Sequence, residues 1–241
     1  MPADALLKLY SHSRNRLAPN VNALDPSLYF TYFNDFTTLL DLTNDWAAVK
    51  DGAVVPIQLD AFGGVLSIPT DVNNNDEHYL SSIAENWIFA ANKPLWFEAL
   101  VACTEANVDD ANLIFGLSDT VAANSLLDNG AGPMASYDGA VWFKVDGGTV
   151  WQFETSNAGT QVTTASAGAF LSNTFYRIGF LFNPGAGTTG TITPYLNGIK
   201  GAAHSITLAG LEEMHILLGA KAGGGAAEVP RVDYVKIIQK R

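Results

Sequence analysis

Few side chains in this sequence have the types and spacings that metal or nucleophilic chemistry requires. The four histidines, His12, His78, His204 and His215, show no metal-ligand spacing with one another or with the single cysteine, Cys103. Cys103 ends the apolar run "WFEALVAC", a context typical of a buried structural thiol rather than a nucleophile. No serine lies in a Gly-x-Ser-x-Gly turn, and "GAGTTG" lacks the lysine and helix of a phosphate-binding loop. These patterns favour neither a metal centre nor nucleophilic catalysis.

A pair of tryptophans offers binding chemistry instead. Trp142 and Trp151 flank the turn sequence "VDGG", and aromatic faces of this kind can stack on the C–H face of a sugar ring. If Asp146 and Gly147 form a two-residue type I′ turn, Trp142 lies opposite Trp151 on one face of a sheet. A four-residue loop shifts the register and separates the two rings. The sequence leaves two alternatives, a carbohydrate-stacking platform or a pair of core aromatics.

Two segments are rich in side-chain oxygens, residues 71–78 ("DVNNNDEH") and 107–112 ("NVDDAN"). Carboxylates and amides are ligands that calcium prefers, but neither segment has the ligand periodicity of a known calcium loop. Aspartate and asparagine are also the usual residues of solvated turns. We therefore expect turns here, and we predict no metal and no cofactor.

Composition and charge narrow the function classes. The chain has 241 residues, of which 48% are hydrophobic and only 15% are charged, and its net charge is −11. Such a length fits one large β domain with a sizeable core. Residues 17–230 hold six of the thirteen bases and twenty-two of the twenty-four acids, a net charge of −16. An acidic body repels nucleic acid and anionic membranes, so neither is an expected partner.

The N-terminal sequence and the apolar runs bear on localisation. Met1 is followed by Pro2, Asp4 and Lys8 without an apolar h-region, so we expect no secretory signal. No apolar run approaches the ~18 residues of a membrane span. A single cysteine excludes an intramolecular disulfide.

The two ends of the chain are basic. Residues 1–16 and 231–241 hold seven bases and two acids. These ends either bind an acidic neighbour, which includes another copy of the chain, or are solvated tails. Under the first alternative, the expected partner-binding residues are Leu6, Leu7, Tyr10, Arg14, Arg16, Lys240 and Arg241.

Two regions are expected along the chain. Residues 3–16 have the spacing of a short amphipathic helix, and Pro19 and Pro26 interrupt the sequence that follows. We therefore assign residues 1–34 to an N-terminal arm and residues 35–241 to one domain. Short apolar runs bounded by Gly, Pro, Asn and Asp predict strands over residues 54–60, 63–69, 85–90, 95–103, 112–117, 140–145, 149–154, 175–182, 191–198, 214–220 and 232–239. Asn197-Gly198 predicts a type I′ hairpin turn. The expected fold is all-β, a two-sheet antiparallel jelly-roll sandwich.

Several of these segments, in order, resemble the concanavalin A-like jelly roll shared by laminin G-type domains, legume-lectin-like domains and β-glucanases. "FNDF" followed by "DW" resembles the entry strand, and "WFEALV" followed by "NLIFGLSD" resembles the strand pair that leads into the inner sheet. "FYRIGFLF" with "TPYLNGI" resembles the late hairpin, and "VDYVKIIQ" resembles the return strand. The resemblance covers residues 35–241.

The glucanases of this fold carry a Glu-x-Asp-x-(x)-Glu pattern on one inner strand, which sets two carboxylates about 5–5.5 Å apart for a retaining mechanism. None of the eight glutamates of this chain is followed two residues later by aspartate. The resemblance therefore extends to the scaffold without the catalytic motif, and we predict that the protein is not an enzyme.

Three functions remain. Catalytically empty sandwiches of this type occur among bacteriophage virion proteins, so the resemblance first implies a capsid decoration or auxiliary (cement) protein. That protein is expected to be made in the host cytoplasm, to form a homo-oligomer, and to bind the major capsid protein or other virion subunits through its arm and tail. The alternative is a lectin-like module that binds glycans through Trp142 and Trp151. The third is a glycan-cleaving enzyme with displaced carboxylates, Glu98 and Glu154.

Overall fold

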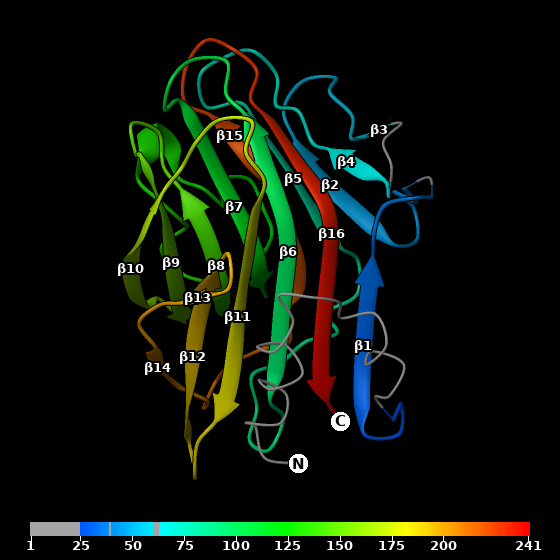
Figure 1. The fold of residues 1–241 in the computed structure, drawn as a ribbon, viewed down its shortest axis with the longest axis vertical. Helices are drawn as coiled ribbons and strands as arrows, with labels where there is room; N and C mark the ends of the chain where they lie inside the picture. Colours follow the sequence, from blue (N-terminus) through cyan, green and yellow to red (C-terminus); the bar gives the residue numbers. More distant parts are fainter. Residues whose placement is uncertain (1–24, 39, 60–62) are drawn as a thin grey trace.

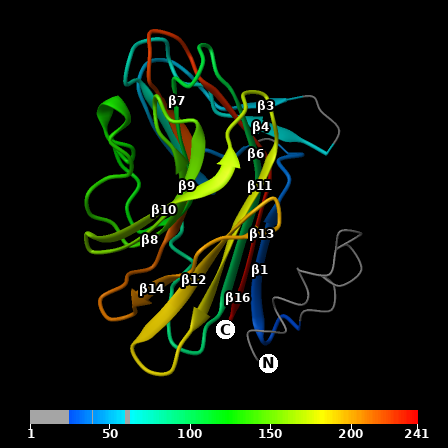
Figure 2. The same cartoon turned by 60° about the vertical axis from the view of Figure 1, so that its left-hand side comes forward.

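The computed structural model describes residues 25–38, 40–59 and 63–241. Within them the chain forms two antiparallel sheets packed face to face (Figures 1 and 2). Sheet A has the order β13-β12-β11-β6-β16-β4-β3, with β1 beside β16 and β14 beside β12. Its strands are Tyr29–Asn34 (β1), Ile57–Leu59 (β3), Val65–Ser67 (β4), Leu95–Thr104 (β6), Tyr176–Pro184 (β11), Thr189–Leu196 (β12), Ile199–Lys200 (β13), His204–Thr207 (β14) and Val229–Lys240 (β16).

Sheet B has the order β10-β9-β8-β7-β15-β5-β2. Its strands are Trp46–Lys50 (β2), Glu77–Ser82 (β5), Ala111–Ser118 (β7), Gly139–Lys144 (β8), Val150–Asn157 (β9), Thr160–Ala169 (β10) and His215–Ala222 (β15). The described residues contain one short helical turn, the 3₁₀ segment Asp128–Gly130 (η1). None of their helices is long and apolar enough to cross a bilayer. The predicted all-β, two-sheet antiparallel sandwich is confirmed.

The core lies between the sheets because alternate residues of each strand point inward. Phe97 of β6 stacks on Phe180 of β11 with ring centroids 5.0 Å apart, and Phe153 of β9 meets Phe180 from the opposite sheet at 5.8 Å. Trp46 and Trp87 lie in the same buried cluster, as their apolar surroundings in the sequence predict. Trp96 is buried in a separate cluster with Tyr29, Leu181 and Ile238.

The boundary drawn between arm and body differs from the structure. Residues 29–34, assigned to the arm, form β1 and pair with residues 235–240 of β16 as part of sheet A. The two prolines that suggested an irregular arm lie before this strand, so they do not prevent its pairing. The expected helix at residues 3–16 lies outside the described residues.

The two predicted hairpin turns have different outcomes. Asn197 and Gly198 both have positive φ, 52° and 80°, and Leu196 pairs with Ile199, which confirms the type I′ turn. At the other turn only Gly147 has a positive φ, 71°, and its N–H donates to the carbonyl of Asp109. The loop between β8 and β9 is therefore longer than two residues, and the predicted type I′ turn is wrong.

Candidate functional site

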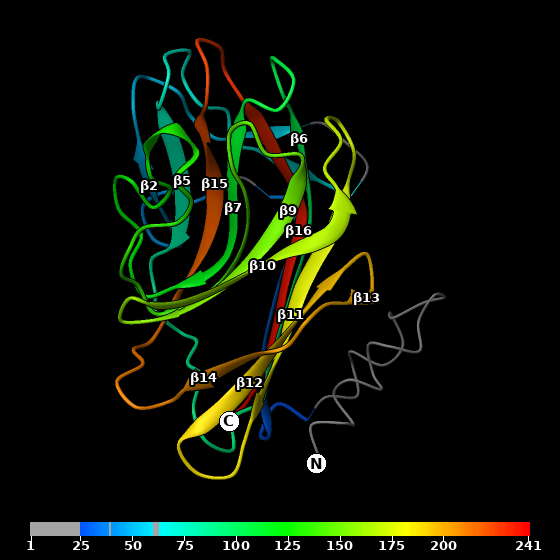
Figure 3. The same ribbon diagram turned by 90° about the vertical axis from the view of Figure 1, so that its left-hand side faces the viewer.

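At one edge of the sandwich, β10 of sheet B lies across from the β12–β13 hairpin of sheet A (Figure 3). β10 is the edge strand of sheet B, and its pairing with β9 shifts register between Ala165 and Ala169. Such an irregularity bends a strand away from its neighbour. The residues of β10 that line the pocket here, Ala165, Gly168 and Ala169, are also small and do not fill the space beside the strand. The two sheets therefore do not close on each other at this edge.

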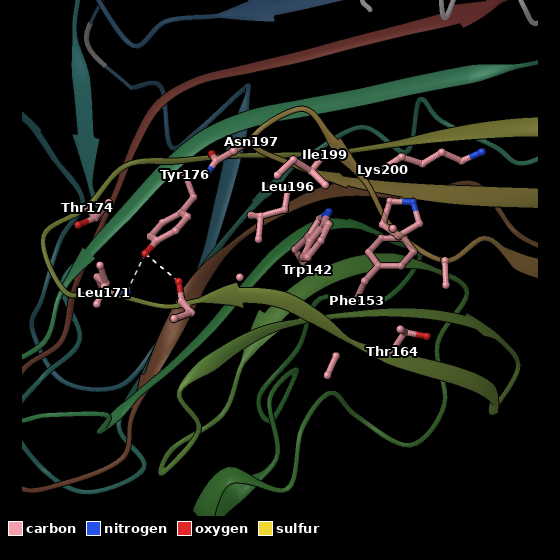
Figure 4. Close-up of a pocket in the computed structure, with 16 residues that line it drawn as sticks. Trp142, Phe153, Thr164, Leu171, Thr174, Tyr176, Leu196, Asn197, Ile199 and Lys200 are labelled. Carbon is pink, nitrogen blue, oxygen red and sulfur yellow. Dashed lines mark hydrogen bonds between the residues drawn. The ribbon is translucent and has the colours of Figure 1, made fainter.

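A pocket of about 620 Å³ occupies this opening, and we call it the edge pocket (Figure 4). Its volume falls within the ~300–1,000 Å³ of small-molecule sites. β10 and the β12–β13 hairpin form opposite walls, and Trp142 and Phe153 project into it from β8 and β9 of sheet B. The described residues that line it are Trp142, Phe153, Thr164, Ala165, Gly168, Ala169, Leu171, Thr174, Tyr176, Pro194, Leu196, Asn197, Ile199, Lys200, Gly201 and Ala202.

The more deeply placed polar groups of the pocket are already hydrogen-bonded within the protein. The Tyr176 hydroxyl donates to the carbonyl of Ala169 at 3.1 Å and accepts from the N–H of Leu171 at 2.7 Å. Nε1 of Trp142 donates across the core to the carbonyl of Gly179, 2.9 Å away. Burial raises the pKa of Tyr176, so its hydroxyl stays protonated at neutral pH.

A histidine from the other sheet supports the β10 wall. Nε2 of His204, on β14, is hydrogen-bonded to the hydroxyl of Thr164 at 2.9 Å, and its Nδ1 to the hydroxyl of Thr155 at 3.1 Å. The imidazole thus joins sheet A to both β9 and β10 beside the pocket. Burial lowers the pKa of His204, which keeps the ring neutral.

The predicted tryptophan platform is not formed. Trp142 pairs with Phe153, because the longer β8–β9 loop shifts the register. Both Trp142 (2% exposed) and Trp151 (0% exposed) point into the core, where Trp151 packs edge-on against Phe170 and Tyr176. Neither ring presents a face to solvent, so the second alternative, core aromatics, is correct. Trp142 still takes part in the edge pocket, at its inner end.

The outer face of sheet B is covered. Residues 119–138, which we call the cover segment, run between β7 and β8 and pack Leu126 and Tyr137 against outward-facing apolar residues of the sheet. The N–H of Asn124 donates to the carboxylate of Glu77 on β5, with N–O distances of 2.9 and 3.0 Å. Glu77 is also paired with Lys221 of β15 at 3.2 Å. These contacts leave a covered face rather than an open cleft.

The displaced-carboxylate hypothesis fails on geometry. Glu154 lies under the cover segment, where it accepts hydrogen bonds from Tyr137 at 3.1 Å and Gln161 at 2.9 Å. Glu98 alternates with core residues Phe97 and Ala99 on β6, so it faces outward from sheet A. The two carboxylates therefore lie on opposite outer faces of the sandwich and cannot flank one glycosidic bond.

Polar side chains of the two oxygen-rich segments form hydrogen bonds within their own segments. Asp76 accepts from the N–H and the side-chain amide of Asn73, each at 2.9 Å, and Asp110 accepts from Asn107 at 2.8 Å. No group of three or more potential metal ligands is found among the described residues. Residues 71–76 and 107–110 lie in loops, and residues 77–78 and 111–112 begin β5 and β7.

The C-terminal residues expected to bind a partner make contacts within the chain, and their role in partner binding stays a prediction. Lys240 pairs with Tyr29 at the end of β16. The N–H of Arg241 donates to the carbonyl of Leu28 and its Nε to that of Pro26, each at 2.9 Å, and its guanidinium lies over the ring of Phe30. This end is the terminus of a strand rather than a free tail. Leu6, Leu7, Tyr10, Arg14 and Arg16 lie outside the described residues.

One buried carboxylate makes stability depend on pH. Glu228 is fully buried, and its Oε1 has no hydrogen-bond partner among the described residues. Desolvation, followed by the nearby charges of Glu105 and Asp110, raises its pKa from 4.5 to about 7, against the opposing effect of Ala106 and Lys144. Because the folded state holds this proton more tightly than the unfolded state, the contribution to stability is full below pH 4.5 and is lost as pH rises through 7.

We therefore expect Glu228→Gln to match the wild type near pH 5 and to exceed its free energy of unfolding by about 2 kcal/mol at pH 8. Urea denaturation at several pH values measures the difference. Glu213→Gln, at an exposed position, is the control and should show no such trend. A difference that stays flat between pH 5 and 8 would show that Glu228 does not titrate in this range.

Comparisons with known proteins identify the fold. No family model matches the chain, and no curated protein sequence matches it. An endo-1,3-β-glucanase from Streptomyces sioyaensis superposes with a TM-score of 0.61 at 13% identity, covering 90% of this chain and 98% of that one. An endo-β-1,4-glucuronan lyase from Trichoderma reesei gives 0.60 at 11% identity, covering 86% and 94%. Peanut lectin gives 0.58 at 10% identity, covering 88% and 97%. Identities this low show the fold alone, and the predicted concanavalin A-like jelly roll is confirmed.

Proposed function

We propose that this protein is a non-catalytic binding module and that the edge pocket is its ligand site. The observation that carries the proposal is the pocket itself, about 620 Å³ with aromatic and aliphatic walls and few polar groups. Such a composition is typical of sites that bind a small molecule or one end of a larger one. Among the described lining residues there is no carboxylate, cysteine or histidine, and the hydroxyl of Tyr176 is already hydrogen-bonded within the protein.

The solved structures of similar fold include a lectin, a glucanase and a lyase, so this scaffold supports both recognition and catalysis. A lectin-like role remains compatible with this structure if the ligand binds at a different place. Recognition takes place in the edge pocket, with Trp142 at its inner end, rather than on an exposed platform of Trp142 and Trp151.

Native mass spectrometry of the protein purified from cell extract tests the proposal. We expect a population carrying one small molecule, which is released on denaturation and is absent from Thr164→Trp, a variant whose indole fills the pocket. A bound molecule retained equally by that variant would place the ligand elsewhere. A wild-type protein that carries nothing and binds no member of a small-molecule library would refute the binding role.

A second candidate is the assembly role in a virus particle, as a capsid decoration protein. The observation that favours it is a set of exposed apolar side chains in or next to β1 and β3, on the side of β16 that faces away from β6, which we call the apolar stripe. The exposed side chains are Leu28, Phe33, Val55, Ile57 and Leu59. Exposed apolar edge strands are common sites of pairing between chains. In this proposal the stripe, rather than Lys240 and Arg241, contacts a second copy or another virion subunit.

The double variant Ile57→Lys/Leu59→Lys tests the assembly role. If the stripe pairs copies of the chain, light scattering should show an oligomer for the wild type and a monomer for the variant, since two buried lysines would oppose association. Val162→Lys, on the edge strand of sheet B, is the matched control and should leave the mass unchanged. A wild type that is monomeric at all concentrations would argue against self-assembly through this edge.

A further inference from the structure

We infer that the edge pocket takes an anionic amphiphile, with its apolar chain inside the pocket and its acidic head group against Lys200 at the mouth. The inference rests on the proposed function and adds the chemical class of the ligand. It follows from how the polar groups of the pocket are distributed between its interior and its rim.

The interior offers a ligand almost no hydrogen bonds. The indole N–H of Trp142 and the hydroxyls of Tyr176 and Thr164 are all engaged with protein groups. Apart from the hydroxyl of Thr174, the remaining interior surface comes from apolar side chains such as Phe153 and Leu196. A ligand hydroxyl in this space would lose its bonds to water without replacement, at a cost that disfavours binding. The interior therefore favours a hydrocarbon chain over a saccharide.

The mouth, by contrast, has unused polar groups. Lys200 is exposed, is the one charged side chain among the described lining residues, and makes no hydrogen bond or ion pair to any of them. It follows the type I′ turn, in which Oδ1 of Asn197 accepts from the N–H of Arg177 at 2.9 Å, so the side-chain N–H₂ of Asn197 is left for a ligand. An ammonium and an amide N–H₂ are both donors, which is the chemistry that recognises a carboxylate or sulfate.

The position of Ile199 fits the same occupant. Its side chain is 74% exposed and lies between Asn197 and Lys200 on the pocket lining. An apolar side chain beside a cation covers the first methylene groups of a bound chain while the charge meets the head group. Apolar walls inside the pocket and one cation at its rim fit an amphiphile with an anionic head group. The net protein charge of −11 repels anions at long range, so Lys200 must supply the local attraction.

A calorimetric titration with matched ligands tests the inference. The probes are decanoate, decanol and decyltrimethylammonium, each below its critical micelle concentration, and maltotriose. We expect decanoate to bind about fivefold more tightly than decanol at low salt, the cation to bind more weakly than decanol, and maltotriose not to bind. The advantage of decanoate should shrink in high salt, because an exposed ion pair is screened.

Two variants separate the head-group contact from the pocket. Lys200→Met should abolish the preference for decanoate while keeping decanol binding, and Lys93→Met, at an exposed position outside the pocket lining, should change nothing. Equal affinities for decanoate and decanol, unaffected by Lys200→Met, would overturn the head-group assignment and leave the binding role standing. Binding of maltotriose alone would overturn the ligand class. No binding of any probe, together with no small molecule on the purified protein, would refute the pocket as a ligand site as well.

Discussion

Replacement of Lys144 by methionine is expected to lower the free energy of unfolding by about 3–5 kcal/mol, the range for breaking a buried ion pair. The Lys144 side chain is 0% exposed, and its Nζ lies 2.8 Å from Oε1 of Glu105, whose side chain is 4% exposed. Nζ also donates to the carbonyls of Asp109 and Ala111, at 2.9 and 3.0 Å. Methionine keeps the apolar stem but removes the ammonium from both carbonyls and from the Glu105 carboxylate, which keeps the N–H of Ala111 as a donor.

The effect should reach the edge pocket. Nζ of Lys144 lies 5.1 Å from the centroid of the Phe170 ring, and Phe170 stacks on Tyr176. The neighbours of Phe170 in the chain, Ala169 and Leu171, line the pocket. We therefore expect Lys144→Met to weaken ligand binding as well as stability.

Chemical denaturation measures the first effect, and the double variant Lys144→Met/Glu105→Gln is its internal check. It should recover part of the loss, because no buried carboxylate is then left unpaired. Lys93→Met, at an exposed site, should stay within about 0.5 kcal/mol of the wild type. A Lys144→Met protein as stable as the wild type would show that Glu105 finds another donor or is solvated.

Filling the edge pocket is expected to remove ligand binding without unfolding the protein. Thr164 of β10 pairs with Phe153, and its hydroxyl contacts His204, so its side chain faces the pocket and Thr164→Trp places an indole in the cavity. We expect decanoate affinity to fall at least about tenfold, or 1.4 kcal/mol, since the indole and the ligand compete for the same volume. The free energy of unfolding should fall by only about 1 kcal/mol, the contribution of the lost hydrogen bond between Thr164 and His204.

Ala47→Trp is the matched control. Ala47 is exposed, on β2, the opposite edge strand of the same sheet, and is not part of the pocket lining. In titration calorimetry, Ala47→Trp should bind decanoate with the same affinity as the wild type. If both tryptophan variants bind decanoate like the wild type, the ligand does not enter the pocket.

The fold could be predicted because the central strands carry large apolar side chains bounded by turn residues. β6, β7, β8, β11, β15 and β16 all fall on predicted runs, and these strands build most of the core. The predicted strand at residues 85–90 is the exception. Trp87 and Phe89 there are buried, but the segment makes only isolated bridges, because apolar content reports burial more reliably than pairing.

The site could not be predicted, because the strand that forms one of its walls lacks that signal. β10 reads "TQVTTASAGA", with one large apolar residue, Val162, and small side chains toward its end. Small residues do not produce the alternating apolar pattern by which a strand is recognised. The same small residues leave space for the pocket beside β10. The tryptophan pair failed for a different reason. The pairing of Trp142 with Trp151 required a two-residue loop between β8 and β9. Because the loop length sets the register, the sequences of the two strands alone could not show that Trp142 pairs with Phe153 instead.

Methyl NMR of the full chain titrated with decanoate tests the central claim, that the edge pocket is the binding site, most directly. The methyl groups of Leu171, Leu196 and Ile199 line the pocket, whereas those of Leu80 and Ile216 lie in the core away from that lining. We predict saturable shifts of the first three with one dissociation constant, and unchanged positions for the other two. Saturable shifts confined to Ile57 and Leu59 on β3, or no shifts at saturating ligand, would contradict the claim.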